Sequence, residues 1–340
     1  MFRLLKTLLL LAILAGIALA AGLYWFSRQP LSLNAELVEF RIQPGSGFRG
    51  AIGQMRAGGI QLPGLPFIAL ARIQGKDDMV KAGSYELQRG ATPNDLLNKI
   101  TRGEFATSQI LLVEGWTFKQ MRQALDAHPH LEHVTQGLGE GEVMRRLGVP
   151  GVAAEGRFFP DTYRFFKNDS DLEVMKQAYV AMNAQLQQAW EARAPDLPFK
   201  TPDDALILAS IVEKETGSRA DRDLIAAVFI NRLRISMRLQ TDPTVIYGLG
   251  DAFDGNLRKV DLLNDTPYNT YTRDGLPPTP IAMPGLESIR AVMHPAASNA
   301  LYFVARGDGS SHFSGSLNEH NRAVDRYQRN GRAASANQGK

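Results

Sequence analysis

Residues Thr201–Gly217 read TPDDALILASIVEKETG and form the most informative stretch of the chain. Thr201 is a good N-cap, Pro202 suits the first helical position, and the two aspartates that follow favour the positive end of a helix dipole. Gly217 is a natural helix stop. We therefore predict one helix over this stretch.

A rotation of about 100° per residue decides which side chains share a face of this helix. Its apolar face is formed by Ile207, Leu208, Ile211 and Val212. Glu215 lies near the middle of that face, because it follows Ile211 by four residues and Leu208 by seven. Glu213 points to the opposite side, where we expect a solvated carboxylate.

Glu215 is a candidate general acid. An apolar environment disfavours the charged form of a carboxyl group and raises its pKa, so the group can hold a proton near neutral pH. Two alternatives stay open from the sequence. The helix could fray before Glu215 and leave its side chain in water, or the carboxylate could pair with Arg219 or Arg222.

Three polar segments, all predicted to be loops, carry the aromatic, amide, hydroxyl and carboxylate groups that a cleft for a polar ligand needs. They are Glu155–Tyr163, Leu239–Thr244 and Pro267–Thr272. The same residue types are common turn formers, so ordinary turns are the simpler explanation from composition alone.

The stretch Thr7–Phe26 contains no charged residue and is long enough to cross a bilayer core of about 30 Å. Arg3 and Lys6 precede it, which predicts a cytoplasmic N-terminus and an exported body. The alternative is a cleaved signal peptide, because Ala18–Ala20 resembles a cleavage site, although the apolar region of such a peptide is usually shorter.

A small α+β module is predicted to follow this anchor. Leu37–Ile42 alternates like a half-buried strand, and a turn then leads to a helical pattern over Phe48–Arg56. A second strand is predicted at Gly83–Leu87, a helix is predicted after the N-cap Thr92, and the module is predicted to end near Gly103. The module could be a spacer or could bind a ligand, and the pattern does not choose between them.

The composition narrows the function further. The chain has 340 residues, no cysteine and a net charge of +3, so it has neither disulfides nor thiolate metal sites, and a nucleic-acid footprint is not expected. His128, His130 and His133 are close in sequence, but Pro129 lies among them and no zinc-like pattern follows, so we predict no metal or cofactor site. The last residues, 331–340, are predicted to be a disordered tail.

Several motifs, in order along the chain, carry a resemblance to a known family. They are Ala209–Thr216 (ASIVEKET), Val228–Leu233 (VFINRL), Arg238–Gly248 (RLQTDPTVIYG), Tyr268–Tyr271 (YNTY), Gly275–Pro278 (GLPP) and His294–Ala296 (HPA). Through them the chain resembles the YceG-like family of membrane-anchored lytic transglycosylases, nearly from end to end. The resemblance implies an α+β protein with a membrane anchor at residues 1–30, a LysM-like module at 31–108 and a catalytic domain at 109–330.

The resemblance also implies a chemistry. Lytic transglycosylases place their catalytic glutamate before a serine, and the pair Glu215–Thr216 is similar, with the hydroxyl kept. Glu215 would protonate the oxygen between MurNAc and GlcNAc and would then take the proton of the MurNAc C6 hydroxyl, which forms 1,6-anhydroMurNAc without hydrolysis. Residues expected to bind glycan or to support Glu215 are Glu155, Asp161, Tyr163, Gln240, Asp242, Tyr247, Asn269 and Tyr271.

The implied setting is the bacterial cytoplasmic membrane, with the catalytic domain in the periplasm or cell-wall space. The implied partners are peptidoglycan strands and peptidoglycan synthases, whose nascent strands the enzyme would cut and terminate. Two alternatives remain: a non-catalytic peptidoglycan-binding scaffold, and a muramidase-type hydrolase, which would need a second carboxylate about 5 to 9 Å from Glu215.

Overall fold

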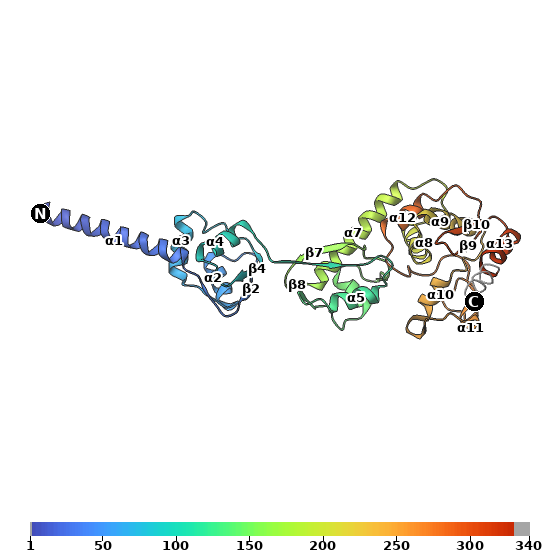
Figure 1. Ribbon diagram of the computed structural model, residues 1–340, viewed down its shortest axis with the longest axis horizontal. Coiled ribbons are helices and arrows are strands. Elements are labelled where there is room, and N and C mark those ends of the chain that lie inside the picture. Colours follow the sequence, from blue (N-terminus) through green and yellow to red (C-terminus); the bar gives the residue numbers. More distant parts are fainter. Residues whose placement is uncertain (1, 330–340) are drawn as a thin grey trace, which may run out of the picture. The chain divides into compact units, whose positions relative to one another are not determined.

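The computed structural model describes residues 2–329, so the predicted tail at 331–340 lies outside the described residues. Its contacts divide the chain into two compact units (Figure 1). Unit 1 consists of residues 1–109 and 164–169, and unit 2 consists of residues 110–163 and 170–340. The predicted α+β class is confirmed, because helices and strands occur in both units. The predicted division at 30/31 and 108/109 stays a prediction.

Unit 1 begins with one long helix and continues as an α+β body. Its elements are α1 (Phe2–Arg28), β1 (Ser32–Leu33), β2 (Leu37–Ile42), α2 (Phe48–Ala57), β3 (Ile60–Gln61), α3 (Gly64–Ile73), β4 (Gly83–Gln88) and α4 (Pro93–Arg102). Among residues 2–329, α1 is the one helix long and apolar enough to span a membrane. The predicted strands and helices of the module are all present.

The core of unit 1 lies between an antiparallel strand pair and helices α2, α3 and α4. In the register of β2 with β4, Phe40 faces Tyr85, and the two rings stack with centroids 5.4 Å apart. The alternation of β2 is explained by this packing, because Val38, Phe40 and Ile42 are buried. Thr92 caps α4 as predicted, in a capping box with Asp95.

Two paired strands, β5 (Thr107–Leu111) and β7 (Thr162–Phe166), contain two of the three boundaries at which the chain passes from one unit to the other. The third boundary lies within the short strand β8 (Asp169–Ser170). The segment 164–169 thus belongs to unit 1 although it lies far along the chain. Lys167 shows why, because its ammonium donates to Glu39 at 2.7 Å and to Glu86 at 3.1 Å.

Unit 2 is mainly helical. Its elements are α5 (Phe118–Asp126), β6 (Leu131–Glu132), α6 (Glu140–Arg146), α7 (Asp171–Glu191), α8 (Pro202–Glu215), α9 (Arg219–Arg234), α10 (Asp242–Leu249), a 3₁₀ turn (Gly250–Ala252), α11 (Lys259–Leu263), α12 (Leu286–Met293), β9 (Tyr302–Ala305), β10 (Ser311–Ser314), α13 (Leu317–Val324) and a π-helical turn (Asp325–Arg329). Helix α8 lies at its centre and packs against α7, α9, α10 and α12 (Figure 1).

Two of the three predicted loops are only partly loops. The segment 155–163 runs into strand β7 at Thr162, and the segment 239–244 becomes helix α10 at Asp242. Pro243 explains the second case, because proline fits the first turn of a helix as well as it fits a turn. The third segment, 267–272, consists of turns as predicted.

Candidate active site

Glu215 is the last residue of α8, and both ends of that helix are set by local chemistry. The Thr201 hydroxyl accepts a hydrogen bond from the Asp204 backbone N–H, and the Thr201 backbone N–H donates to the Asp204 carboxylate, which completes a capping box at the start. The helix continues without fraying to Glu215, and Thr216 is its extended C-cap. The alternative of a frayed end is therefore wrong.

The expectation for Glu213 is wrong as well. Its carboxylate is half-buried and accepts hydrogen bonds from the Gly285 backbone N–H at 3.0 Å and the Ser288 hydroxyl at 2.7 Å, at the start of α12. The physical reason is that α8 is buried almost all round, so that its apparently polar side faces α12 and not water. Glu213 thus accepts from one backbone N–H and one hydroxyl at the start of a neighbouring helix, where N–H groups have no partner within the helix.

Glu215 accepts a hydrogen bond from the Thr241 hydroxyl at 2.7 Å. Burial raises the pKa of Glu215 above its ordinary value, and the negative charge of Asp242 raises it further. The Thr241 hydrogen bond and the positive charge of Arg232 act in the opposite direction, but burial is the largest effect. Among the ion pairs of the described residues, none joins Glu215 to Arg222. The side chain of Arg219, the other proposed partner, lies outside the description.

The turn at 267–272 holds the residues that face Glu215. The Thr270 hydroxyl accepts from the Thr241 backbone N–H at 3.1 Å, and the Tyr271 hydroxyl donates to Asp242 at 2.5 Å. Asn269 is fully buried, and its amide donates to Asn264 at 2.7 Å while its oxygen accepts from the Tyr271 N–H at 2.9 Å. Asn269 thus orients the turn and, through it, Asp242.

Arg232 is a functional candidate that the sequence reasoning missed. It is only 7% exposed, and its guanidinium donates to the carbonyls of Leu301 at 2.7 Å and Leu239 at 2.6 Å. This buried positive charge lies behind Glu215 and stabilises its ionised form. The sequence did contain a signal for Arg232, because it lies with Asn231 in the otherwise apolar run VFINRL of α9. An arginine that is buried in such a run needs a partner.

Glu155 forms a second buried carboxyl site. It is 6% exposed and accepts hydrogen bonds from the Phe118 backbone N–H at 3.0 Å and from the Tyr247 hydroxyl at 3.1 Å. Burial raises the pKa of Glu155 to about 7, although these two hydrogen bonds favour its charged form. Gly156, which follows it, has a φ of +75° and lies so close to Pro280 that a Cβ atom would collide with it.

A cleft of about 880 Å³ opens beside Glu155. It is lined by Thr117, Phe118, Lys119, Gln120, Gln123, Glu140, Glu155, Lys214, Pro243, Ile246, Tyr247, Gly250, Asp251, Tyr268 and Ile281. Helix α10 connects the two carboxyl sites, because Thr241 precedes it at Glu215 and Tyr247 reaches Glu155. At a rise of 1.5 Å per residue, these two positions are about 9 Å apart along the helix.

The other predicted residues have mainly local contacts. The Tyr163 hydroxyl donates to the Phe159 carbonyl at 2.7 Å, and Asp161 is exposed and accepts from the Thr162 N–H at 2.6 Å. The Thr216 hydroxyl accepts from the Ser218 N–H at 2.9 Å. Gln240 is exposed, with a φ of +48°, directly before Thr241.

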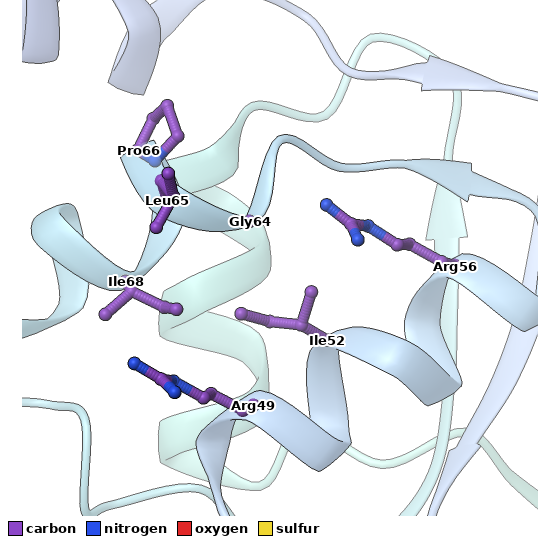
Figure 2. Close-up of a pocket in the computed structure, with 7 residues that line it drawn as sticks. All are labelled: Arg49, Ile52, Arg56, Gly64, Leu65, Pro66 and Ile68. Atoms are coloured by element: carbon purple, nitrogen blue, oxygen red, sulfur yellow. The ribbon is translucent and has the colours of Figure 1, made fainter.

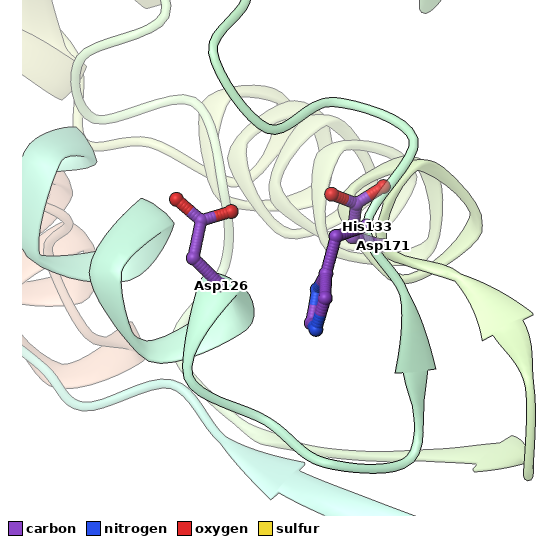
Figure 3. Close-up of side chains that lie close together, drawn as sticks. All are labelled: Asp126, His133 and Asp171. Atoms are coloured by element: carbon purple, nitrogen blue, oxygen red, sulfur yellow. The ribbon is translucent and has the colours of Figure 1, made fainter.

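Within residues 2–329, one group of side chains has ligand atoms spaced as for a metal ion: Asp126, His133 and Asp171 (Figure 3). Their candidate atoms all lie within 4.8 Å of one another. Asp171 already accepts hydrogen bonds from the hydroxyl and backbone N–H of Thr135, which explains its burial. Of the three neighbouring histidines, only His133 belongs to this group.

Known proteins are similar to this chain in sequence and in structure. The sequence profile of the YceG-like family matches residues 40–326. The endolytic murein transglycosylase of Bacillus subtilis is 32% identical over 294 residues, which cover 76% of this chain and 81% of that protein. The endolytic murein transglycosylase of Streptococcus pneumoniae is 28% identical over 330 residues, which cover 87% of this chain and 59% of that protein.

A crystal structure of a yceG-like protein from Listeria monocytogenes is also similar. It is 27% identical, with a TM-score of 0.53, and the match covers 84% of this chain and 98% of that one. The family profile spans both units and includes Glu155, Glu215 and Tyr271. The chain therefore belongs to the YceG-like family.

Proposed function

We propose that this chain is a peptidoglycan lytic transglycosylase in which Glu215 acts first as acid and then as base. The observation that carries this proposal is a partly buried Glu215 whose pKa is raised by desolvation and which accepts a hydrogen bond from Thr241. The two relatives named endolytic murein transglycosylases support the substrate class.

In the proposed reaction, Glu215 gives its proton to the oxygen that joins C1 of MurNAc to GlcNAc, and the bond from C1 to that oxygen breaks. The C6 hydroxyl oxygen of the same MurNAc forms a new bond to C1, and its proton passes to the Glu215 carboxylate. The products are a 1,6-anhydroMurNAc end and a free GlcNAc hydroxyl. Water is not consumed and Glu215 regains its proton, so the cycle needs no metal or cofactor.

The neighbours of Glu215 suit both halves of this cycle. Burial and the Asp242 charge favour the acid that the first step needs, whereas the Thr241 hydroxyl and Arg232 stabilise the carboxylate that the second step needs. We assign Tyr271 and Asn269 to the positioning of Asp242, and we assign Gln240, exposed beside Thr241, to glycan contact. Asp161, Tyr163 and Thr216 support the loops that carry them.

The cleft beside Glu155 is the proposed place for the sugar units next to the cleaved bond. Its phenolic and apolar rings offer faces for sugar rings, and its amides and charges can fix the hydroxyl and acetamido groups. Because this cleft follows α10 from Pro243 to Gly250, we infer that a glycan strand lies along that helix.

Glu215→Gln is the test, because it keeps the shape and removes the transferable proton. Purified sacculi treated with this variant are expected to release no anhydro-ended muropeptides, as measured by mass spectrometry. Glu213→Gln is a matched control, because a glutamine oxygen can still accept from Gly285 and Ser288. Full activity of Glu215→Gln would rule out the assignment, and products heavier by one water would indicate a hydrolase.

We further propose that α1 anchors the protein in the bacterial cytoplasmic membrane with unit 2 on the outer side, where it cuts nascent strands endolytically and ends their growth beside peptidoglycan synthases. The apolar length of α1 supports the anchor. Unit 1, as a LysM-like module, would hold the strand near the membrane. A secreted form that begins at Leu31 should cleave isolated glycan but should fail to shorten strands in cells. Full replacement of the anchored form would contradict this role.

A further inference from the structure

Helix α3 exposes apolar side chains next to α1. Leu65 and Ile73 are 81% and 74% exposed, and with Ala69 they recur every four residues, which places them on one face. The opposite face contains Phe67, which is fully buried in unit 1. An exposed apolar face of this kind on an ordered helix indicates an interaction surface.

This face continues the surface of the membrane-spanning helix. An apolar groove of about 640 Å³ runs between the two helices. It is lined by Gly16, Ala18, Leu19, Ala20, Gly22, Leu23 and Phe26 of α1 and by Leu65, Pro66, Ala69 and Ile73 of α3. Lipid that surrounds α1 at this level must therefore also meet α3.

The length of α1 sets the depth at which this happens. Its 27 residues extend about 40 Å, which exceeds a bilayer core by about 10 Å. The uncharged stretch Thr7–Phe26 accounts for the core, so the excess consists of residues 2–6 at one end and Ser27 and Arg28 at the other. Leu23 and Phe26, close to the second end, also pack against the core of unit 1. The outer boundary of the hydrocarbon is thus expected near Phe26, with α3 at the boundary between the acyl chains and the lipid headgroups.

Two arginines lie beside the start of α3. Figure 2 shows Arg49 and Arg56 of α2 reaching toward Gly64–Ile68, with Ile52 between them. Together with Leu65 and Pro66 they line a pocket of about 500 Å³. Arg56 donates to the Leu62 carbonyl at 2.8 Å, and among residues 2–329 neither arginine forms a salt bridge with a carboxylate. A guanidinium in such a place suits a phosphate.

We propose that α3 and the Arg49–Arg56 pocket form a second membrane contact, which binds anionic phospholipids at the outer face of the bilayer that α1 crosses. The exposed face of α3 enters the boundary between headgroups and acyl chains, as amphipathic interfacial helices do, and the two arginines bind lipid phosphates. Unit 1 is thereby fixed on the membrane surface and does not swing freely on α1. The inference rests on the proposed anchor and is independent of the glycan chemistry.

The absence of cysteine from the whole chain makes a clean test possible. The full-length Ile73→Cys protein, labelled with a polarity-sensitive fluorophore, is reconstituted in vesicles that contain phosphatidylglycerol. Lipids with a quencher on the acyl chain are expected to quench this label several-fold more than a label at Glu104→Cys. Glu104 is the control because it is exposed and follows the far end of α4, whose start lies beside Tyr24 of α1.

A third label, at Leu14→Cys within α1, separates the possible failures. Quenching at Leu14 without quenching at Ile73 would overturn the second contact and leave the anchor intact. No quenching at Leu14 would overturn the anchor and the second contact together. An Ile73 label that is shielded from lipid quenchers and also from a water-soluble quencher would indicate a protein on α3 and would likewise overturn the proposal.

The arginines are tested in the same assay. Replacing phosphatidylglycerol by phosphatidylcholine is expected to reduce quenching of the Ile73 label about two-fold or more. The double variant Arg49→Gln with Arg56→Gln should respond equally to both lipids. If phosphatidylglycerol increased quenching as much in the double variant as in the protein that keeps both arginines, the proposed role of Arg49 and Arg56 would be contradicted. As a matched control, Arg102→Gln on α4 should keep the lipid dependence.

Discussion

Glu215, which is partly buried, and Glu155, which is buried, are two carboxyl groups that contact the same segment around α10, but their surroundings differ. Glu215 accepts from a side-chain hydroxyl and lies near one negative and one positive charge. Glu155 accepts from a backbone N–H and a phenol at the edge of a cleft. Burial raises the pKa of both, so an altered pKa alone does not identify the catalytic residue.

The difference lies in what each group can do with its proton. Glu215 is partly exposed and has one hydrogen-bond donor among the described residues, Thr241, so in the proposed mechanism its carboxyl group exchanges a proton with the substrate. Both oxygens of Glu155 accept from the Phe118 N–H, at 3.0 and 3.2 Å, and one also accepts from Tyr247. We infer that Glu155 holds the cleft together, whereas Glu215 performs the chemistry.

The largest difference between Glu215 and Glu155 is expected in the reaction rate when each is replaced by glutamine. Glu215→Gln is expected to lower the rate of anhydro-muropeptide release about 10²- to 10⁴-fold, the usual contribution of general acid–base catalysis. Glu155→Gln should stay within a few-fold of the wild type at pH 6, because Glu155, with a pKa of about 7, is mostly neutral there. Release rates from purified sacculi at pH 6 measure both. Equal losses of release rate in the two variants would contradict the separate roles of Glu215 and Glu155.

The free energy of unfolding of unit 2 should depend on pH, because the pKa of Glu155 is raised in the folded state. Since the folded pKa is about 7 and the ordinary value is 4.5, the folded state binds the extra proton between these values. This contribution is complete below pH 4.5 and is lost as the pH rises through 7, a loss of about 3 kcal/mol. Glu155→Gln should remove this loss.

Denaturant unfolding at several pH values, followed by the fluorescence of Trp116 and Trp190, measures this effect. Glu191→Gln serves as the control, because Glu191 is exposed and a glutamine there can still accept from Gln187. An identical pH dependence of the free energy of unfolding in Glu155→Gln and the wild type would refute the assigned pKa.

Removing the Thr241 hydroxyl, which donates to Glu215, should have a smaller effect on the reaction rate. Thr241→Val removes a hydrogen bond that stabilises the carboxylate, so the pKa of Glu215 rises further and the alkaline limb of the rate profile moves to higher pH. A loss of about 1 kcal/mol corresponds to a roughly five- to ten-fold lower rate. Thr272→Val is the control, because its hydroxyl donates to Asp265. An unmoved alkaline limb would contradict the role of Thr241.

The smallest change is expected for Tyr247→Phe, which keeps the ring against Tyr268 and removes the donor to Glu155. The pKa of Glu155 should rise above about 7, because that hydrogen bond favours its charged form. The free energy of unfolding should fall by about 1 kcal/mol at pH 8 and by less at pH 5. Denaturant unfolding of Tyr247→Phe and the wild type at pH 5 and pH 8 measures this difference. A loss of free energy of unfolding that is larger at pH 5 than at pH 8 would contradict the role of Tyr247.

The sequence by itself determined the local structure and the catalytic candidate. The capping residues Thr92 and Thr201, the alternation of Leu37–Ile42 and the apolar length of α1 are encoded within one helix or strand, and all are found. Glu215 could be singled out because its spacing from Leu208 and Ile211 is also local. A family resemblance at the same residues pointed to the same glutamate.

Only the tertiary structure decided what surrounds those residues. Thr241 meets Glu215 across 26 residues of sequence, Glu213 meets Gly285 across 72, and Tyr247 meets Glu155 across 92. Helical periodicity states which side of α8 is apolar, but it does not state that α12 covers the other side. The roles of Glu213, Arg232 and the exposed face of α3 depend on such neighbours, because burial and pKa are set by whichever segment the fold brings close.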